Sequence, residues 1–288
     1  MRWKGRRQST NVQDHRGRST APKLALGGGL GAIVLLLAGQ FLGVDISSLL
    51  GSLPGGDVGA SGSTQTTGAP RSAAEEERAE FSKTVLAATE DVWNQLLGDG
   101  RYREPTLNFF SGRVQSGCGV QESAVGPFYC PPDFGVYIDL EFFQELKTRY
   151  GAGGDFAPAY VIAHEVGHHL QNILGTSSEV RRLQQRASKT EANELSVRLE
   201  LQADFYAGVW AHHEQRMFDS LEPGDIEEAL TAANAIGDDT LQRRSGGSIR
   251  PDLFTHGTSE QRKRWFFKGY ETGDPNAGDT FSVPASQL

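Results

Sequence analysis

Cysteine is scarce in this sequence, and so is positive charge. The chain has 288 residues, of which two are Cys, 28 are Lys or Arg and 36 are Asp or Glu. Two cysteines exclude a disulfide-dense scaffold and are too few for a cysteine-rich zinc site. An apolar fraction of 38% excludes a wholly disordered chain. The composition indicates one globular domain of medium size with appendages.

The few basic residues are concentrated at the N-terminus. Residues 1–23 contain seven of the Lys and Arg side chains and one Asp. The remaining 265 residues carry 21 basic and 35 acidic side chains. Because an acidic body repels a phosphate backbone, we expect no nucleic-acid partner.

A long apolar run follows this basic segment. Residues 24–44 contain no charged side chain, and at about 1.5 Å per residue they are long enough to cross a hydrocarbon layer of ~30 Å. The positive-inside rule then places residues 1–23 in the cytoplasm and the rest of the chain outside. A cleaved signal peptide is the alternative, although this run exceeds the usual length of about 7–15 residues.

The composition of the next segment predicts a flexible linker over residues 45–74. Fifteen of the 22 residues from 51 to 72 are Gly, Ser, Thr or Pro. Such a segment buries too little apolar surface to become ordered. The main domain then covers residues 75–271, and residues 272–288 are expected to form a loose tail.

The two cysteines, Cys118 and Cys130, are predicted to form a disulfide. Both lie in the part expected to be exported, where thiols oxidise. The bridge would close a loop of 13 residues and would contribute about 3 kcal/mol to stability. Two unpaired buried thiols are the alternative.

The main domain is predicted to be an α+β fold that is mostly helical. Apolar residues at steps of three and four indicate helices, and two segments rich in β-forming residues indicate a small sheet. The expected helices span about 75–97, 141–150, 157–174, 189–216, 225–241 and 259–270, and the β segments span 106–114 and 135–140.

The helix at 157–174 carries the pattern His164-Glu165-Val166-Gly167-His168. Histidines at i and i+4 share one helical face, so both rings can bind one Zn²⁺ ion. Glu165 would lie beside a zinc-bound water and could accept its proton. The bare pentapeptide also arises by chance, so a third ligand is needed to support the interpretation.

The helix at 189–216 offers that ligand. Glu200 and Asp204 are one turn apart among apolar neighbours, and a buried carboxylate needs a partner or a metal. Glu200 can complete a His₂Glu site that keeps a position open for water. Asp204 can accept the second ring N–H of a ligand histidine. The alternative is a solvated helix face that carries ordinary charges.

Five motifs distributed along the chain are more specific than the pentapeptide. They are Met1-Arg2-Trp3-Lys4-Gly5-Arg6-Arg7, Gly126-Pro127-Phe128-Tyr129-Cys130-Pro131, His164-Glu165-Val166-Gly167-His168-His169, Glu200-Leu201-Gln202-Ala203-Asp204-Phe205-Tyr206-Ala207-Gly208-Val209-Trp210-Ala211 and Thr255-His256-Gly257-Thr258-Ser259-Glu260-Gln261-Arg262. Together they resemble the bacterial neutral zinc metallopeptidases, a membrane-anchored family with a gluzincin-like pair of catalytic helices. The resemblance implies a zincin-like domain, zinc binding by His164, His168 and Glu200, and catalysis by Glu165.

The resemblance also draws attention to His256. In gluzincins a histidine outside the zinc pair donates a hydrogen bond to the oxyanion, and His256 is the candidate for that catalytic role. It lies two residues before the expected N-cap, Thr258. A local structural role is the alternative.

We therefore predict a zinc metalloendopeptidase with one Zn²⁺ per chain, anchored in the bacterial cytoplasmic membrane with its N-terminus inside and its catalytic domain external or periplasmic. It would hydrolyse peptide bonds of a peptide or protein substrate by a zinc-activated water, with Glu165 as general base. The substrate could add as a strand along segment 106–114. A zinc-stabilised envelope binding module and the hydrolysis of a non-peptide amide are the alternatives. The sequence predicts neither specificity nor oligomeric state.

Overall fold

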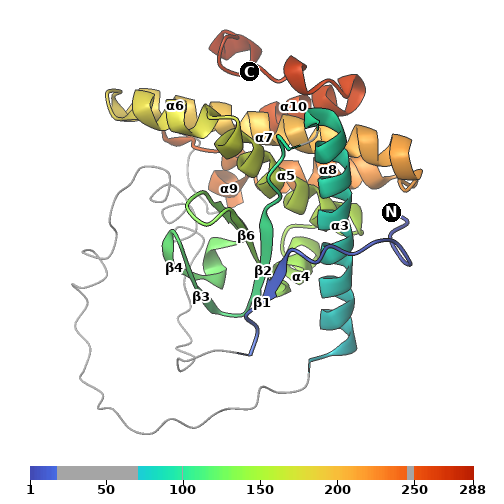
Figure 1. The fold of residues 1–288 in the computed structure, drawn as a ribbon. Helices are drawn as coiled ribbons and strands as arrows, with labels where there is room; N and C mark the ends of the chain where they lie inside the picture. The colour runs from blue at the N-terminus through green and yellow to red at the C-terminus, as the bar shows by residue number, and fades with distance from the viewer. Residues whose placement is uncertain (18–70, 99, 245–249) are drawn as a thin grey trace, which may run out of the picture.

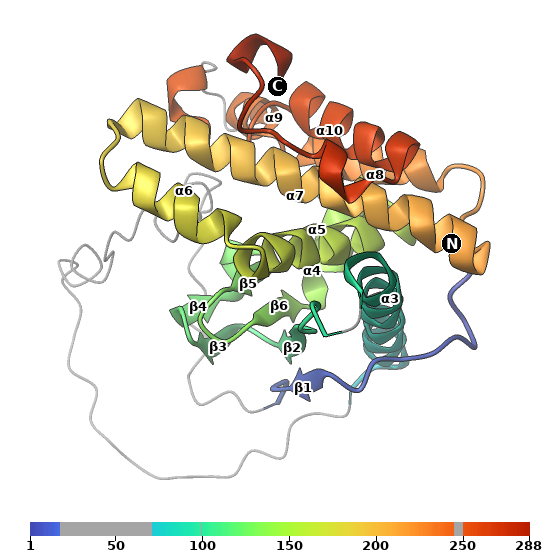
Figure 2. The same cartoon turned by 45° about the horizontal axis from the view of Figure 1, so that its top comes forward.

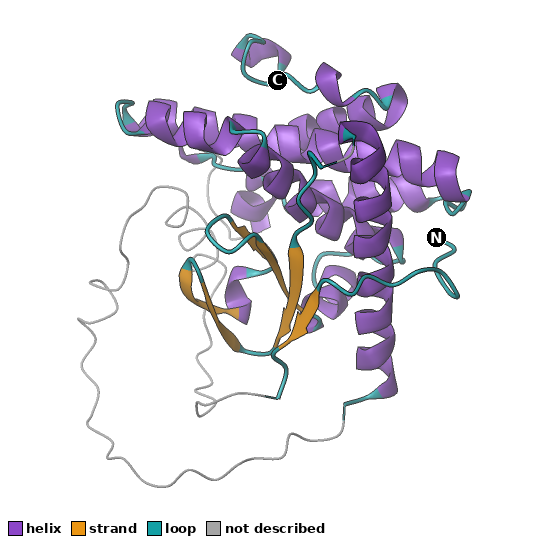
Figure 3. Cartoon of the chain, viewed as in Figure 1, coloured by secondary structure: helices purple, strands orange, loops and turns teal. Residues whose placement is uncertain are grey.

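The computed structural model describes residues 1–17, 71–98, 100–244 and 250–288. A small sheet lies beside a larger group of helices (Figures 1 and 3), so the expected α+β class with mostly helical content is confirmed. Within these ranges no helix is long and apolar enough to cross a bilayer. The span expected at 24–44 lies outside the described residues, as does most of the expected linker.

The main sheet contains four strands in the order β1-β2-β6-β5. The strands are β1 (Val12–Asp14), β2 (Thr106–Phe110), β5 (Phe128–Cys130) and β6 (Gly135–Asp139). β1, β2 and β6 run parallel, and β5 is antiparallel to β6. Because β2 has a neighbour on both sides, a substrate cannot add along it, and the strand-addition hypothesis is wrong for residues 106–110.

The expected β segment at 106–114 is interrupted by a turn. Gly112 has a φ of 74°, and the chain then enters a separate hairpin of β3 (Arg113–Ser116) and β4 (Gly119–Glu122), followed by the short 3-10 helix η1 (Ser123–Val125). A positive φ is readily available to glycine, which explains why the strand ends here.

The helices follow the expected order with two differences. They are α3 (Ala73–Leu97), α4 (Glu141–Thr148), α5 (Phe156–Ile173), α6 (Thr176–Gln184), α7 (Lys189–Phe218), α8 (Asp225–Ala235), α9 (Asp238–Arg244) and α10 (Ser259–Thr272), with short 3-10 helices η2 (Pro251–Leu253), η3 (Pro275–Ala277) and η4 (Ala285–Gln287). α6 was not expected, because only one of its residues is buried and no apolar stripe marks it. The helix expected at 225–241 is two helices, α8 and α9.

The break between α8 and α9 occurs where α10 begins. A side chain at Gly237 would collide with Ser259. The next residue, Asp238, accepts hydrogen bonds from the backbone N–H groups of Thr255 (2.7 Å) and His256 (2.6 Å). The chain therefore turns at Gly237 and fixes the loop that precedes α10.

The long helix α7 packs against both α5 and α10 (Figure 2). A Cβ at Gly208 of α7 would collide with the carbonyl oxygen of Phe266, and one at Gly269 of α10 would collide with that of Phe205. These two glycines let the backbones of α7 and α10 touch. α10 is thereby held close to the helix pair formed by α5 and α7.

Residues 1–17 pack against the domain, although the sequence analysis assigned residues 1–23 to a separate basic segment. β1 pairs with β2, and the ring of Trp3 contacts Phe81 of α3 edge to face at 5.4 Å. Ion pairs join Arg6 to Glu214, Arg7 to Glu90 and Asp91, and Arg16 to Asp14, Glu75 and Glu76. The basic segment thus supplies counter-charges to carboxylates of the domain.

The C-terminal residues, expected to form a loose tail, also pack against the domain. Thr280 and Leu288 are buried. The hydroxyl of Thr280 donates to the carbonyl oxygen of Arg198 at 2.7 Å, and the guanidinium of Arg198 donates to the carbonyl oxygen of Val283 at 2.9 Å. The side chain of Gln202 in α7 also donates to the carbonyl oxygen of Gly278 at 3.0 Å, so the segment is tied to α7 through two residues of that helix.

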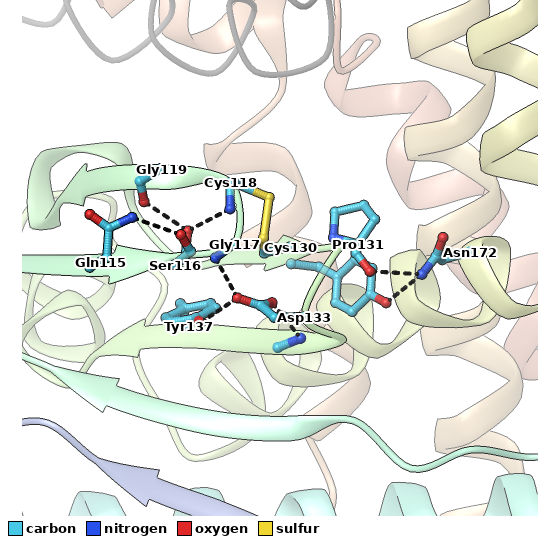
Figure 4. The surroundings of a disulfide bond; sticks show 12 residues. Gln115, Ser116, Gly117, Cys118, Gly119, Cys130, Pro131, Asp133, Tyr137 and Asn172 are labelled. Atoms are coloured by element: carbon cyan, nitrogen blue, oxygen red, sulfur yellow. Dashed lines mark hydrogen bonds between the residues drawn. A yellow bond between two sulfur atoms is a disulfide. The ribbon is translucent and has the colours of Figure 1, made fainter.

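Cys118 and Cys130 form the predicted disulfide, with their Cα atoms 5.8 Å apart. The bridge ties the turn of the β3–β4 hairpin to the end of β5 (Figure 4). Beside it, the carboxylate of Asp133 accepts hydrogen bonds from the backbone N–H of Gly117 at 2.6 Å and the hydroxyl of Tyr137 at 2.7 Å. These contacts hold together the two segments that flank the loop closed by the disulfide.

Replacing both cysteines by serine is expected to lower the free energy of unfolding by about 3 kcal/mol, because the unfolded chain regains the freedom of the closed loop. Urea unfolding of the full chain with Cys118→Ser and Cys130→Ser, beside the oxidised wild type, measures this difference. The wild type in dithiothreitol should match the double variant. Equal stability of all three samples would contradict a stabilising role for the bridge.

Candidate metal site

Helices α5 and α7 bring His164, His168 and Glu200 together, as expected from the need of the buried Glu200 carboxylate for a partner. The Nε2 atom of His164 lies 3.3 Å from Oε2 of Glu200, and Nε2 of His168 lies 3.5 Å from Oε1 of the same carboxylate. All three residues are buried, and their ligand atoms lie within 4.8 Å of one another. One ion placed between them can contact all three side chains.

Gly167 allows the two helices to approach at this point. A Cβ on Gly167 would lie 2.8 Å from the carbonyl oxygen of Ala203 and 2.9 Å from its Cα. Ala203 lies between Glu200 and Asp204 in α7, so this close approach of the two backbones is beside the ligands. The glycine in the His-Glu-x-Gly-His pattern therefore sets the distance between the two imidazoles and the carboxylate.

Gly167→Ala is expected to weaken zinc binding about tenfold or more, an effect similar to the loss of a group that orients a ligand. The added methyl group pushes α5 away from α7 and separates His164 and His168 from Glu200. Competition with a chromogenic chelator measures the affinity. Gly135→Ala is the matched control, because it crowds Tyr137 and Asn108 in the sheet, away from the ligands, and should reduce stability without this loss of affinity. Unchanged zinc affinity in Gly167→Ala would contradict the role given to Gly167.

The two imidazoles are oriented by acceptors on their other ring nitrogen. Nδ1 of His164 lies 2.8 Å from Oδ1 of Asp204, and Nδ1 of His168 lies 2.9 Å from Oε1 of Gln171. Each Nδ1–H donates, so a neutral ring directs the lone pair of its Nε2 toward the Glu200 carboxylate. Lone pairs that face an anion need a positive charge between them, either a metal ion or a proton. Two imidazole nitrogens and one carboxylate form a donor set that suits Zn²⁺.

The charges of the site also indicate that it binds a cation. Burial lowers the pKa of His164, but the carboxylates of Asp204 and Glu200 outweigh burial and raise it to about 9. Burial raises the pKa of Glu200, but His168 and His256 hold it well below its usual range. In the absence of metal, a proton on His164 therefore compensates the carboxylates. A divalent cation supplies the same compensation.

Asp204 connects the site to a third helix. Its carboxylate accepts two hydrogen bonds from Arg262 of α10, from Nε at 2.8 Å and from Nη2 at 3.0 Å, and another from the hydroxyl of Tyr160. Burial alone would raise the pKa of Asp204, but Arg262 and His164 lower it by more, so that this pKa lies below its usual value. Asp204 thus stays ionised and holds the His164 ring, as the sequence analysis expected.

Three members of this network were not predicted from the sequence: Tyr160, Gln171 and Arg262. Tyr160 is four residues before His164, and Gln171 is three residues after His168, so helical spacing could have revealed both. Arg262 ends the last motif, but it lies 58 residues from Asp204. No local pattern connects those two positions.

Glu165 and His256 line the same cavity as the ligands. Burial raises the pKa of Glu165 above its usual value. Nδ1 of His256 lies 3.2 Å from Oδ1 of Asp238. Burial lowers the pKa of His256, but Asp238 and Glu200 outweigh it and raise that pKa. Asp238 orients His256 through contacts with both the ring Nδ1 and the backbone N–H of that residue. This role of Asp238 was not predicted from the sequence.

The remaining histidines of α5 and α7 have other partners. His169 contacts the carbonyl oxygen of Arg103 through Nε2 and the hydroxyl of Tyr129 through Nδ1, and burial lowers its pKa to about 4. His212 and His213 each contact a backbone carbonyl oxygen at 2.8 Å. None of the three therefore belongs to the ligand cluster, in agreement with their helical positions.

A cavity of about 140 Å³ opens beside the ligands. It is bordered by the segment from η1 to β5, by α4 and α5, by the region around α8 and α9, and by α10. The lining residues are Ser123, Ala124, Val125, Gly126, Pro127, Phe128, Tyr129, Phe142, Glu145, Tyr160, Val161, His164, Glu165, His168, Glu200, Ile236, Leu241, His256 and Arg262. A substrate in this cavity would reach the ligands, Glu165 and His256 together.

Comparison with known proteins agrees with this chemistry. The family model described as "Putative neutral zinc metallopeptidase" matches residues 1–281. The chain is 48% identical over 291 residues to "Uncharacterized protein YpfJ" of Escherichia coli K12, a match that covers 98% of this chain and 99% of that protein. It is 47% identical over 202 residues to "Uncharacterized protein Mb2605" of Mycobacterium bovis, covering 67% of each chain. No solved structure matches. The chain belongs to the neutral zinc metallopeptidase family.

Proposed function

We propose that this protein is a zinc-dependent metalloendopeptidase that hydrolyses peptide bonds. The observation that carries the proposal is the convergence of His164, His168 and Glu200 on one point of a cavity that Glu165 also lines. A Zn²⁺ ion bound there would lower the pKa of a water toward ~7 and polarise a peptide carbonyl. Membership of the family supports the same assignment.

The other residues have roles that follow from their surroundings. Glu165 accepts a proton from the attacking water and passes it to the leaving amine, and the burial that raises its pKa favours this exchange. His256, held by Asp238, donates a hydrogen bond to the oxyanion that forms from the carbonyl oxygen. Asp204 keeps the His164 ring in the tautomer that leaves Nε2 for the metal.

A purely structural zinc site would need a fourth protein ligand. Asp204 is the carboxylate nearest in sequence to Glu200 on that helix face, but its oxygens are bound by His164, Tyr160 and Arg262. Within the part of the chain that the structure describes, the candidate ligand group contains three residues. A position therefore stays open for water, which favours catalysis over a zinc-stabilised binding module.

The proposal is tested by mass spectrometry of a diverse peptide library incubated with the zinc-loaded full chain. Cleavage should disappear after chelation and return when one equivalent of zinc is restored. Absence of cleavage with one zinc per chain confirmed would contradict the peptidase. That result would favour the binding module or the hydrolysis of a non-peptide amide.

We also propose a location at the bacterial cytoplasmic membrane, on the basis of the apolar run at 24–44. Residues 1–17 pack against the domain that holds the metal site, so both parts lie on the same side of any membrane in this conformation. A single span with the N-terminus in the cytoplasm and the metal site outside would require residues 1–17 to leave the domain. We therefore propose that the basic segment and the metal site face one compartment.

Gln8→Cys and Ser178→Cys, at two exposed positions, test this arrangement because the native cysteines are bonded to each other. We expect a membrane-impermeant maleimide to give the same result for both variants in intact spheroplasts, since both positions share a compartment. Labelling after lysis is the control for reactivity. Labelling of Ser178→Cys alone in intact spheroplasts would support the single-pass topology and contradict a shared compartment.

A further inference from the structure

The cavity beside the metal ligands has a largely apolar wall. Side chains from four parts of the fold form it, and the metal ligands, Glu165 and His256 border the same space. The apolar members are Ala124, Val125, Pro127, Phe128, Phe142, Val161, Ile236 and Leu241. A peptide whose scissile bond reaches the ligands would therefore place an adjacent side chain near this wall.

The size of the cavity fits one large side chain. Its volume is about 140 Å³, and an apolar protein cavity of about 150 Å³ holds a benzene molecule. A side chain as large as that of Leu or Phe can therefore enter, whereas a side chain such as Ala would leave most of the wall in contact with water.

The charges of the cavity disfavour an acidic side chain. Apart from the histidines, Arg262 is the one basic residue among the lining residues that the structure describes, and its guanidinium is bound to both oxygens of Asp204. Glu145 adds a carboxylate to the lining. A buried carboxylate of the substrate would meet no available guanidinium, which is costly.

The wall is fixed in place before any substrate enters. Seven consecutive lining residues, 123–129, lie inside the loop that the disulfide closes. Tyr129 at the end of this run accepts a hydrogen bond from Asn172 of α5 at 2.9 Å and lies 3.0 Å from Nδ1 of His169. The wall is thus tied to the helix that carries both metal-binding histidines, and it has a defined position relative to them.

We propose that this cavity is a specificity pocket that accepts a bulky apolar side chain next to the scissile bond. The inference rests on the proposed function for its biological meaning, but the pocket can be tested by binding alone. Ile236 and Leu241 are the positions to change. Both line the pocket, and their aliphatic side chains cannot bind the metal or hydrogen-bond to its ligands.

The test measures the binding of N-blocked amino-acid hydroxamates to the zinc-loaded full chain by calorimetry. The hydroxamate group chelates zinc in every compound, and the side chain is varied through Gly, Ala, Leu, Phe and Asp. We expect Leu and Phe compounds to bind about tenfold to 100-fold more tightly than the Gly compound, as expected for burial of side chains of that size. The Asp compound should bind no better than the Gly compound.

Two variants test whether the apolar wall causes the preference for the Leu and Phe compounds. Ile236→Phe fills the pocket and should remove the preference for Leu and Phe while the Gly compound binds as before. Leu183→Ala removes a partly exposed apolar side chain outside the pocket and should change nothing. Equal affinity for all side chains in the wild type, a preference for Asp, or no hydroxamate binding with zinc content confirmed would overturn the proposal.

The two proposals fail in different ways. Graded hydroxamate binding without cleavage of any peptide would leave the pocket in place and contradict the peptidase. Peptide cleavage with no preference for apolar residues on either side of the cut would support the peptidase and contradict the pocket.

Discussion

Glu165→Gln is expected to reduce kcat/KM for peptide cleavage by about 10²- to 10⁴-fold, the usual contribution of general acid–base catalysis, and to leave zinc content unchanged. An amide has nearly the shape of the carboxylate but cannot accept the proton of the attacking water. Glu165 is also outside the ligand cluster of His164, His168 and Glu200, so its charge is not needed to hold the metal. Kinetics on the best peptide of the library, with zinc measured by mass spectrometry, give both quantities.

His168→Ala is the matched comparison for this experiment. It removes a ligand nitrogen and should lose both zinc and turnover. A Glu165→Gln protein that cleaves peptides at the wild-type rate would exclude Glu165 as general base, and one that loses zinc would mean that Glu165 takes part in binding the metal.

Removal of residues 1–17 is expected to lower the free energy of unfolding by about 3–5 kcal/mol or more, the range for breaking a buried ion pair. Glu214 and Glu90, with side chains 0% and 3% exposed, would lose Arg6 and Arg7 as partners. β2 would lose its neighbour β1, and the core would lose Trp3. Urea unfolding of residues 18–288 beside the full chain measures the effect.

Addition of a synthetic peptide of residues 1–17 shows whether the loss of stability comes from the missing contacts or from nonspecific misfolding of the truncated chain. The peptide should bind the truncated chain and restore stability, and a peptide with Arg6→Ala and Arg7→Ala should do so poorly. Equal stability of the truncated and full chains would show that the N-terminal segment is not part of the fold.

Much of the helical part of the fold was predictable because local chemistry determines it. The helix at 259–272 begins where Thr258 and Gln261 form a capping box, which the sequence displays directly. The pairs His164 and His168, and Glu200 and Asp204, each fall on one helical face by spacing alone. The meeting of these two helix faces was inferred because a buried carboxylate needs a partner or a metal. The structure brings the two faces together.

The parts that were not predictable depend on contacts between distant segments. β1 is three residues long and lies in a basic segment, so it carries no strand pattern, and its pairing with β2 spans more than 90 residues. Arg262 reaches Asp204 only because α7 and α10 cross at two glycines. The division between α8 and α9 depends on Ser259, which occupies the space beside Gly237.

Anomalous diffraction at the zinc absorption edge, from crystals of the zinc-loaded full chain, tests the central claim most directly. We predict one peak per chain, bound by Nε2 of His164, Nε2 of His168 and the carboxylate of Glu200, with a remaining position open to solvent in the cavity that Glu165 lines. A peak elsewhere, or a fourth protein ligand that closes the coordination sphere, would contradict the assignment of a catalytic zinc site.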